Sequence, residues 1–114
     1  MYSIDRSVAI IRPKQPFLDW ANKLPDAEEE VSLEDLVDDC TAILIAECDD
    51  AQKAKALINA MALDFLESEL FSWCTYQNWW PQNRTKEMFW DWFDVEFHSI
   101  VIDPYQDRIK RKVL

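Results

Sequence analysis

The stretch Phe71–Phe97, FSWCTYQNWWPQNRTKEMFWDWFDVEF, decides how this chain folds. It contains ten of the fifteen aromatic residues of the 114-residue sequence and five of its six tryptophans. So much large, rigid apolar surface forms either the centre of a hydrophobic core or the anchors of a binding surface. Helical spacing assigns six residues of the stretch to the core: Phe71, Trp73, Met88, Phe89, Trp92 and Phe93.

The pair Trp79-Trp80, which precedes Pro81, lies in an expected loop between two helices. Two adjacent tryptophans are hard to bury together without helical or strand spacing. We therefore predict that one of them, Trp79, is partly exposed and anchors a protein contact. The alternative is that both rings pack over helix ends.

Short apolar runs alternate with amphipathic segments along the rest of the chain. The runs Ser7–Arg12, Thr41–Ala46 and Val95–Asp103 are rich in β-branched residues and predict three buried strands. Between the first two, apolar residues at helical spacing predict a helix over Pro16–Leu24, which Pro25 ends.

Polar residues mark the expected helix starts. Ser32, with Asp35 three residues later, indicates a capping box at the start of a short helix. Thr85 is the expected cap of a compact helix over Lys86–Phe93.

The longest expected helix runs from Ala51 to about Trp73, and Asp49 or Asp50 caps it. Its apolar stripe rotates by roughly 100° between the two halves, at 3.6 residues per turn. Such a helix contacts two different neighbours, here the sheet and the aromatic stretch. The alternative is a break near Leu63-Asp64.

The resulting order, β-α-(α)-β-α-α-β, predicts an α+β fold. We expect a single small domain over residues 1–114, with 105–114 as a loosely ordered tail, and a mixed sheet of about three strands packed with helices. Helical segments join the first two strands, so these strands are expected to be parallel through a right-handed crossover. The third strand could lie on either edge and run in either direction.

The composition excludes several function classes. Glycine is absent, which excludes P-loops, dinucleotide fingerprints, kinase-type loops and G-x-S-x-G nucleophile elbows. The net charge of −10 argues against a protein that binds nucleic acid by neutralising phosphates. Eight of the fourteen residues of Asp26–Asp39 are acidic, whereas RIKRK (108–112) is basic. These segments are either solvated surfaces or, for the acidic one, a patch that docks on a basic partner.

The three cysteines, Cys40, Cys48 and Cys74, fit a reduced compartment and are expected to be buried, inert thiols. A zinc site that adds His98 is the alternative, but these residues lack the short spacing of zinc ligands. No metal or other cofactor is predicted. No apolar run approaches the roughly 18 residues of a membrane span, and no signal peptide is evident. We expect a cytoplasmic protein without a membrane partner.

His98 is the only histidine, and strand alternation places it on the same side as Glu96. A carboxylate beside an imidazole could form a pair in which the carboxylate orients a base. The alternative is a partly buried histidine bonded to Glu96 or to the backbone. Ser99 points to the opposite side, which excludes a local Ser-His pair. No residue is assigned as catalytic.

Arg12, Lys14 and Arg84 are basic residues in expected loops of an acidic surface. They could hold a carboxylate or phosphate of a ligand or partner. The alternative is structural ion pairing with the abundant acidic residues.

Three segments, RPKQPFLDW (12–20), LEDLVDDCTAILIAE (33–47) and WPQNRTKEMFWDWFDVEFHSIVID (80–103), resemble a family of small uncharacterised bacterial proteins. The resemblance covers most of the chain, and its most specific motif is MF-x-x-WF-x-x-EFHS. It implies a bacterial, cytoplasmic protein with a small α+β domain. It implies no catalytic residues.

These features together predict a non-enzymatic, acidic protein-interaction protein. It would contact a protein partner, or a second copy in a homodimer, through exposed aromatics near Trp79-Trp80 and through acidic patches. Direct nucleic-acid binding is not expected, although acidic surfaces can mimic nucleic acid toward a DNA-binding protein. The alternative is a small-ligand-binding protein or enzyme that uses His98 and Glu96 with Arg12 and Arg84. Convergence of these residues in a cleft would favour the alternative.

Overall fold

A three-stranded sheet built around strand β2 (Arg6–Pro13) is the frame of the protein, for which a computed structural model describes residues 1–114. Strands β3 (Thr41–Ala46) and β4 (Phe93–His98) pair with its two sides, in the order β3-β2-β4. Five α-helices accompany the sheet. The predicted α+β fold is confirmed.

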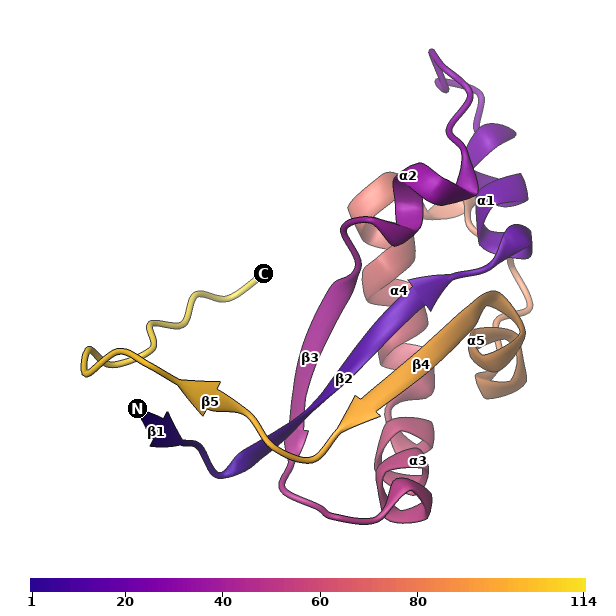
Figure 1. Ribbon diagram of the computed structural model, residues 1–114. Coiled ribbons are helices and arrows are strands. Elements are labelled where there is room, and N and C mark those ends of the chain that lie inside the picture. The colour runs from indigo at the N-terminus through magenta and orange to yellow at the C-terminus, as the bar shows by residue number, and fades with distance from the viewer.

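Both strand pairs are antiparallel, so the predicted parallel pairing of the first two strands is wrong. Ile11 lies opposite Thr41, which shows that β3 begins at the end of the sheet where β2 finishes. The connecting helices α1 (Gln15–Asn22) and α2 (Leu33–Val37) stay near this end (Figure 1). A parallel pair would need a connection that returns along the whole strand. The sheet is therefore antiparallel, not mixed.

The connection that does return along the sheet joins β3 to β4. It consists of three α-helices and one turn of 3-10 helix: α3 (Ala51–Ala60), α4 (Ala62–Trp73), η1 (Gln77–Trp79) and α5 (Lys86–Trp92). Since β3 and β4 are each antiparallel to β2, they run in the same direction on its two sides.

The predicted helix caps are confirmed. The Ser32 hydroxyl accepts a hydrogen bond from the Asp35 N–H, and the Asp35 carboxylate accepts one from the Ser32 N–H, which completes the capping box. Asp50, the second of two candidates, accepts two N–H groups of the first turn of α3. Thr85 accepts one in α5, at 3.2 Å. These caps satisfy N–H groups that have no partner within the helix.

The long predicted helix is broken, which confirms the alternative, although the break lies at Met61 rather than at Leu63-Asp64. Met61 has φ −112° and ψ 10°, outside the helical region. As predicted, the two halves have different neighbours, since α3 packs against β3 and α4 against α5. The predicted apolar stripe is only partly buried, because Leu57, Met61 and Trp73 are exposed. The buried residues are Ala54 and Ile58 in α3, and Ala62, Leu66 and Leu70 in α4.

The hydrophobic core lies between the sheet and the helices, which cover only one of its faces (Figure 1). Ala9 and Ile11 of β2 point into it and are each 1% exposed. Phe17, Phe89 and Phe93 are among its largest fully buried side chains. The Phe93 ring centroid lies 5.1 Å from that of Phe17 and 5.4 Å from that of Phe89. This trio joins α1, α5 and β4.

The core assignment within the aromatic stretch is confirmed for Phe89 and Phe93 and wrong for Phe71, which is 53% exposed. Because α4 turns Leu70 toward the core, the next residue projects about 100° further around the helix. Trp73 is 40% exposed, and its ring makes a T-shaped contact with that of Phe17. The partly buried members packed against the core are Met88 and Trp92.

The third predicted strand ends early, and its remainder forms an arm. After β4 the chain turns, and β5 (Ile102–Asp103) pairs antiparallel with β1 (Tyr2–Ser3) instead of extending the sheet. The tail Pro104–Leu114 contains no helix or strand. The arm and tail elongate the molecule to 46 × 29 × 27 Å. Its radius of gyration, 15.6 Å, exceeds the roughly 13 Å expected for a compact domain of this length.

Ser7, the one fully buried polar residue of the core, ties the three strands together at one end of the sheet. Its hydroxyl accepts a hydrogen bond from the Cys48 N–H at 3.0 Å. It lies 3.0 Å from two carbonyl oxygens, those of Cys48 and Ser99, and can donate its single hydrogen to either of them. One side chain of β2 thus satisfies backbone groups that follow both β3 and β4.

We predict that Ser7→Ala lowers the free energy of unfolding by about 1–3 kcal/mol, because it leaves partly buried backbone groups of Cys48 and Ser99 without this partner. Urea denaturation followed by circular dichroism measures this loss. Ser68→Ala, on the exposed side of α4, is the control and should leave the stability unchanged. Equal stabilities of the two variants would contradict the role given to Ser7.

Glu69 of α4 is a partly buried carboxyl group beside β3. Burial raises its pKa above the usual range, and a hydrogen bond with the Thr41 side chain acts in the opposite direction. The folded protein therefore binds this proton more tightly than the unfolded chain. Stability is lost as the pH rises above the ordinary carboxyl pKa.

We predict that Glu69→Gln raises the thermal midpoint at pH 7, since glutamine stays neutral and keeps an acceptor for Thr41. The gain should vanish below about pH 4, where the carboxyl group is protonated in both states. Thermal unfolding from pH 3 to 8 tests this, with the exposed Glu87→Gln as control. A gain that is constant with pH would refute the assignment to charge burial.

Candidate functional site: the uncovered face of the sheet

The face of the sheet that points away from the helices carries no covering layer (Figure 1). We call it the outer face. Paired residues share a face, so the register places Val8 beside Leu44 and Ile10 beside Ala42 on it. Leu44 is 49% exposed, and the alanines of β3 on this face are also exposed. The apolar part of the outer face consists of Val8, Ile10, Ala42, Leu44 and Ala46.

The β4 side of the outer face is polar. The Glu96 carboxylate lies 2.7 Å from Nε2 of His98 and accepts a hydrogen bond from the Arg12 guanidinium at 3.0 Å. Lys14 lies 3.7 Å from the Asp94 carboxylate and donates to the Trp90 carbonyl. Of the predicted site residues, Arg12, Glu96 and His98 are thus brought together, and Lys14 lies at the same edge.

Glu96 is held in its ionised form. The hydrogen bond with His98, and then the one from Arg12, lower its pKa below the usual range. A carboxyl group with a lowered pKa supports the fold above its ordinary pKa, and this support is lost as the pH falls through the lowered value. The group is exposed, so the effect is local.

We predict that His98→Ala raises the pKa of Glu96 toward its ordinary value, and that Arg12→Met does so to a smaller extent. NMR titration of the side-chain carboxyl carbons measures both shifts. Lys86→Met, in the first turn of α5, is the charge-matched control for Arg12→Met. An unchanged Glu96 titration in His98→Ala would show that the pair does not form in solution.

His98 and Glu96 do not line an enclosed site. Both lie exposed on the open sheet, and five cavities of the molecule, of about 200 to 850 Å³, are lined by neither Arg12, Glu96 nor His98. Ser99 uses its carbonyl oxygen to accept a hydrogen bond from the Ser7 hydroxyl. The arrangement can polarise an imidazole, but it provides no cavity that would exclude water from a substrate.

Arg84 lies apart from this group. Its guanidinium contacts the Glu67 carboxylate of α4 at 3.3 Å, donates to the Pro81 carbonyl and lies over the Trp80 ring. Through these contacts, Arg84 holds the loop that precedes α5 against α4. The structural alternative therefore fits Arg84, and the predicted grouping with Arg12 and His98 is not found.

The two loop tryptophans have different environments. Trp80 is buried, with 6% exposure, and its indole N–H donates to the Cys74 carbonyl at 2.7 Å. It therefore cannot serve as a surface anchor. Trp79 is 37% exposed, in line with the prediction that it is the partly exposed member of the pair. Its ring makes a T-shaped contact with that of Tyr76. Its carbonyl accepts the indole N–H of Trp20, which ties the loop to α1.

The cysteines remain free thiols, and only Cys74 is fully buried. Burial raises the pKa of Cys40, which favours its protonated, unreactive form. No group of three or more His, Cys, Asp or Glu side chains lies close enough together to hold a metal ion.

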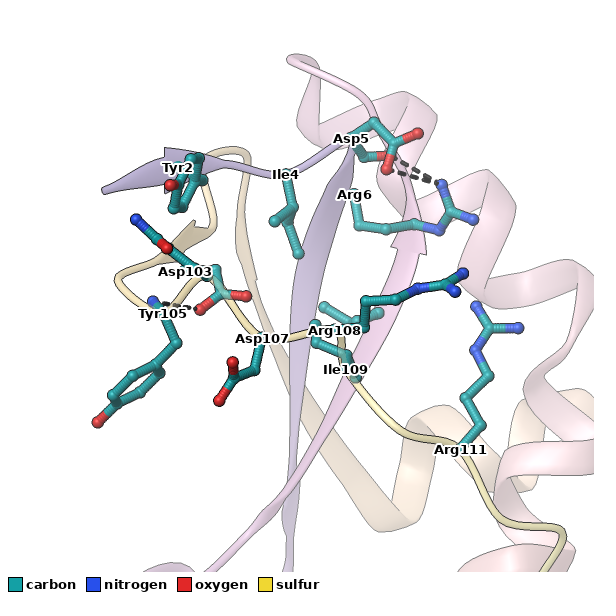
Figure 2. A pocket seen from close by; sticks show the side chains of 12 residues that line it. Tyr2, Ile4, Asp5, Arg6, Asp103, Tyr105, Asp107, Arg108, Ile109 and Arg111 are labelled. Carbon is teal, nitrogen blue, oxygen red and sulfur yellow. Dashed lines mark hydrogen bonds and ion pairs between the residues drawn. The ribbon is translucent and has the colours of Figure 1, made fainter.

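A cavity of about 850 Å³ lies where the arm and the tail meet the outer face (Figure 2). Leu44 and Ile109 contribute apolar walls. The side chains of Arg6, Arg108 and Arg111 extend toward the same part of this cavity, and only Arg6 has an ion pair, with Asp5 at 3.4 Å. This arginine cluster joins residues more than 100 positions apart.

Sequence reasoning missed this part of the surface. The strand TAILIA has no polar alternation to mark its exposed side, so the exposure of Leu44 has no local signal. Arg6 and the tail arginines are brought together only by the pairing of β1 with β5.

Comparison with protein families, curated proteins and solved structures finds no match to this chain, so the family resemblance stays a prediction. None of the helices has both the length and the apolar character needed to cross a bilayer.

Proposed function

We propose that this chain is a non-enzymatic, acidic protein-interaction protein that binds an extended apolar segment of a protein along β3 and the adjoining outer face. The observation that carries the proposal is the uncovered apolar part of the outer face beside the unpaired side of β3. Exposed apolar surface next to free backbone N–H and C=O groups is the arrangement used in strand addition.

The binding surface thus differs from the one expected around Trp79-Trp80. The buried Trp80 and the tethered Trp79 stabilise the loop between α4 and α5. Leu44, by contrast, is half exposed at the centre of β3. A partner strand paired with β3 would place its own apolar side chains next to that of Leu44. The acidic segment Asp26–Asp39 then borders the site instead of forming it.

The alternative, a ligand-binding protein or enzyme, is favoured by one observation, the 2.7 Å contact between His98 and Glu96. Their open position and the separate location of Arg84 weigh against it. Activity or ligand binding abolished by His98→Ala, with protein binding retained, would support the alternative.

We predict that the immobilised protein captures a protein from a lysate of its source cell, or a differently tagged second copy, and that Leu44→Asp abolishes capture. The charge would oppose burial of the strand under a partner. Leu57→Asp is the matched control, because Leu57 is 39% exposed on α3, away from the outer face. Capture should survive this control.

Two outcomes would refute the proposal. One is capture that Leu44→Asp leaves intact, since the contact surface would then lie elsewhere. The other is that neither a lysate protein nor a second copy of the chain is captured, even at concentrations where weak complexes form.

A further inference from the structure

The side of β3 that faces away from β2 is an open sheet edge. β3 pairs only with β2, and no backbone hydrogen bond outside the regular elements involves Thr41–Ala46. Sheet edges are usually protected by charges, prolines or bulges, and TAILIA has no charge and no proline. The opposite edge strand, β4, carries Asp94, Glu96 and His98. Of the two edge strands of this sheet, β3 is therefore the one that can pair with a further strand.

The sequence of β3 is self-complementary. Ala42-Ile43-Leu44-Ile45-Ala46 is the same in both directions. In an antiparallel pair of two copies centred on Leu44, each Ala42 faces an Ala46, and each Ile43 faces an Ile45. The isoleucines extend the core side of the sheet, and the leucines meet on the outer face.

We propose that two copies of this chain form a symmetric dimer by antiparallel pairing of their β3 strands about a two-fold axis at Leu44. This inference rests on the proposed function and names its partner as a second copy. The two sheets become one continuous sheet, with β2 second from the junction in each copy. The interface is isologous and closes after two copies, because it uses the only uncharged edge of the three-stranded sheet.

Acidic residues of the two copies approach each other near the junction. Antiparallel pairing brings Asp38 and Asp39, just before β3 of one copy, toward the end of β3 in the other, where Glu47 and Asp49 follow. These carboxylates repel one another unless cations lie between them. Arg6 lies beside Ala46 in the register, and the tail arginines Arg108 and Arg111 extend toward the same place.

In the dimer, the cluster of Arg6, Arg108 and Arg111 therefore lies close to Asp38 and Asp39 of the second copy. Within one chain, Arg108 and Arg111 have no ion pair, and neither do Asp38 and Asp39. The dimer gives both groups a partner. The tail, whose Ile109 lines the same cavity as Leu44, would contact the second copy.

Sedimentation of the full chain tests the dimer. At about 100 μM, wild type and Leu57→Asp should have twice the 13.5 kDa chain mass, while Leu44→Asp should be monomeric and folded. Loss of a central apolar contact should weaken association by about tenfold or more. A monomeric wild type, or a dimeric Leu44→Asp, overturns the inference.

Cysteine cross-linking tests the register in a background with Cys40→Ser, Cys48→Ser and Cys74→Ala. Directly opposed Cα atoms lie about 4.5–5.5 Å apart, within disulfide range. Leu44→Cys should cross-link by itself. Ala42→Cys and Ala46→Cys should cross-link only when the two variants are mixed, because identical positions lie roughly 13 Å apart along the strands. Any other pattern excludes the proposed pairing.

Charge exchange tests the cluster. Arg108→Glu with Arg111→Glu should shift the protein toward monomer, and adding Asp38→Lys with Asp39→Lys should restore the dimer. A double variant that is as dimeric as wild type, or a quadruple variant that stays monomeric, removes the arginines from the interface.

The two proposals fail in distinguishable ways. If wild type is monomeric but captures an unlike protein through Leu44, the dimer is wrong and the proposed function stands. If wild type is monomeric and captures nothing, both are wrong.

Discussion

Strand β2 is the element on which the rest of the structure depends, because β3 and β4 each pair with β2 and not with each other. Its alternate residues form the sheet side of the core, and Ser7 at its buried end bonds to backbone groups that follow both neighbours. A buried hydroxyl that satisfies several backbone groups holds the strands in one register, since any slip would leave those groups unpaired.

The one-sided covering of this sheet produces the candidate site. Most of the contacts between aromatic rings lie among the helices and the covered face, where Phe17, Phe89 and Phe93 meet. No helix remains for the other face. An antiparallel sheet tolerates this arrangement, because only one of its faces must be buried. As a consequence, Leu44 stays exposed beside the unpaired edge of β3. A partner that paired with β3 would remove the Leu44 side chain and the edge backbone groups from water.

The features that sequence reasoning predicted correctly are local. Caps such as Ser32 and Thr85 follow from residues within one helical turn, and the contact between Glu96 and His98 follows from strand alternation. Arg12 joined that pair only through the register of β2 with β4. For Arg84 the sequence left open a shared site or a structural ion pair, because it shows that a loop arginine needs a carboxylate but not which one. Here Glu67, on the neighbouring helix, supplies it.

The sequence by itself determined the α+β fold, the limits of β3, the starts of the helices capped by Ser32, Asp50 and Thr85, and the absence of glycine-based phosphate sites, because each depends on residue types and spacing along the chain. Only the tertiary structure decided that the sheet is antiparallel, that Trp80 is buried and that Leu44 is exposed. The direction of β3 depends on where the α1-α2 connection ends in space. The exposure of an apolar residue depends on which face the helices cover. Both are properties of the assembled layers, which no local pattern encodes.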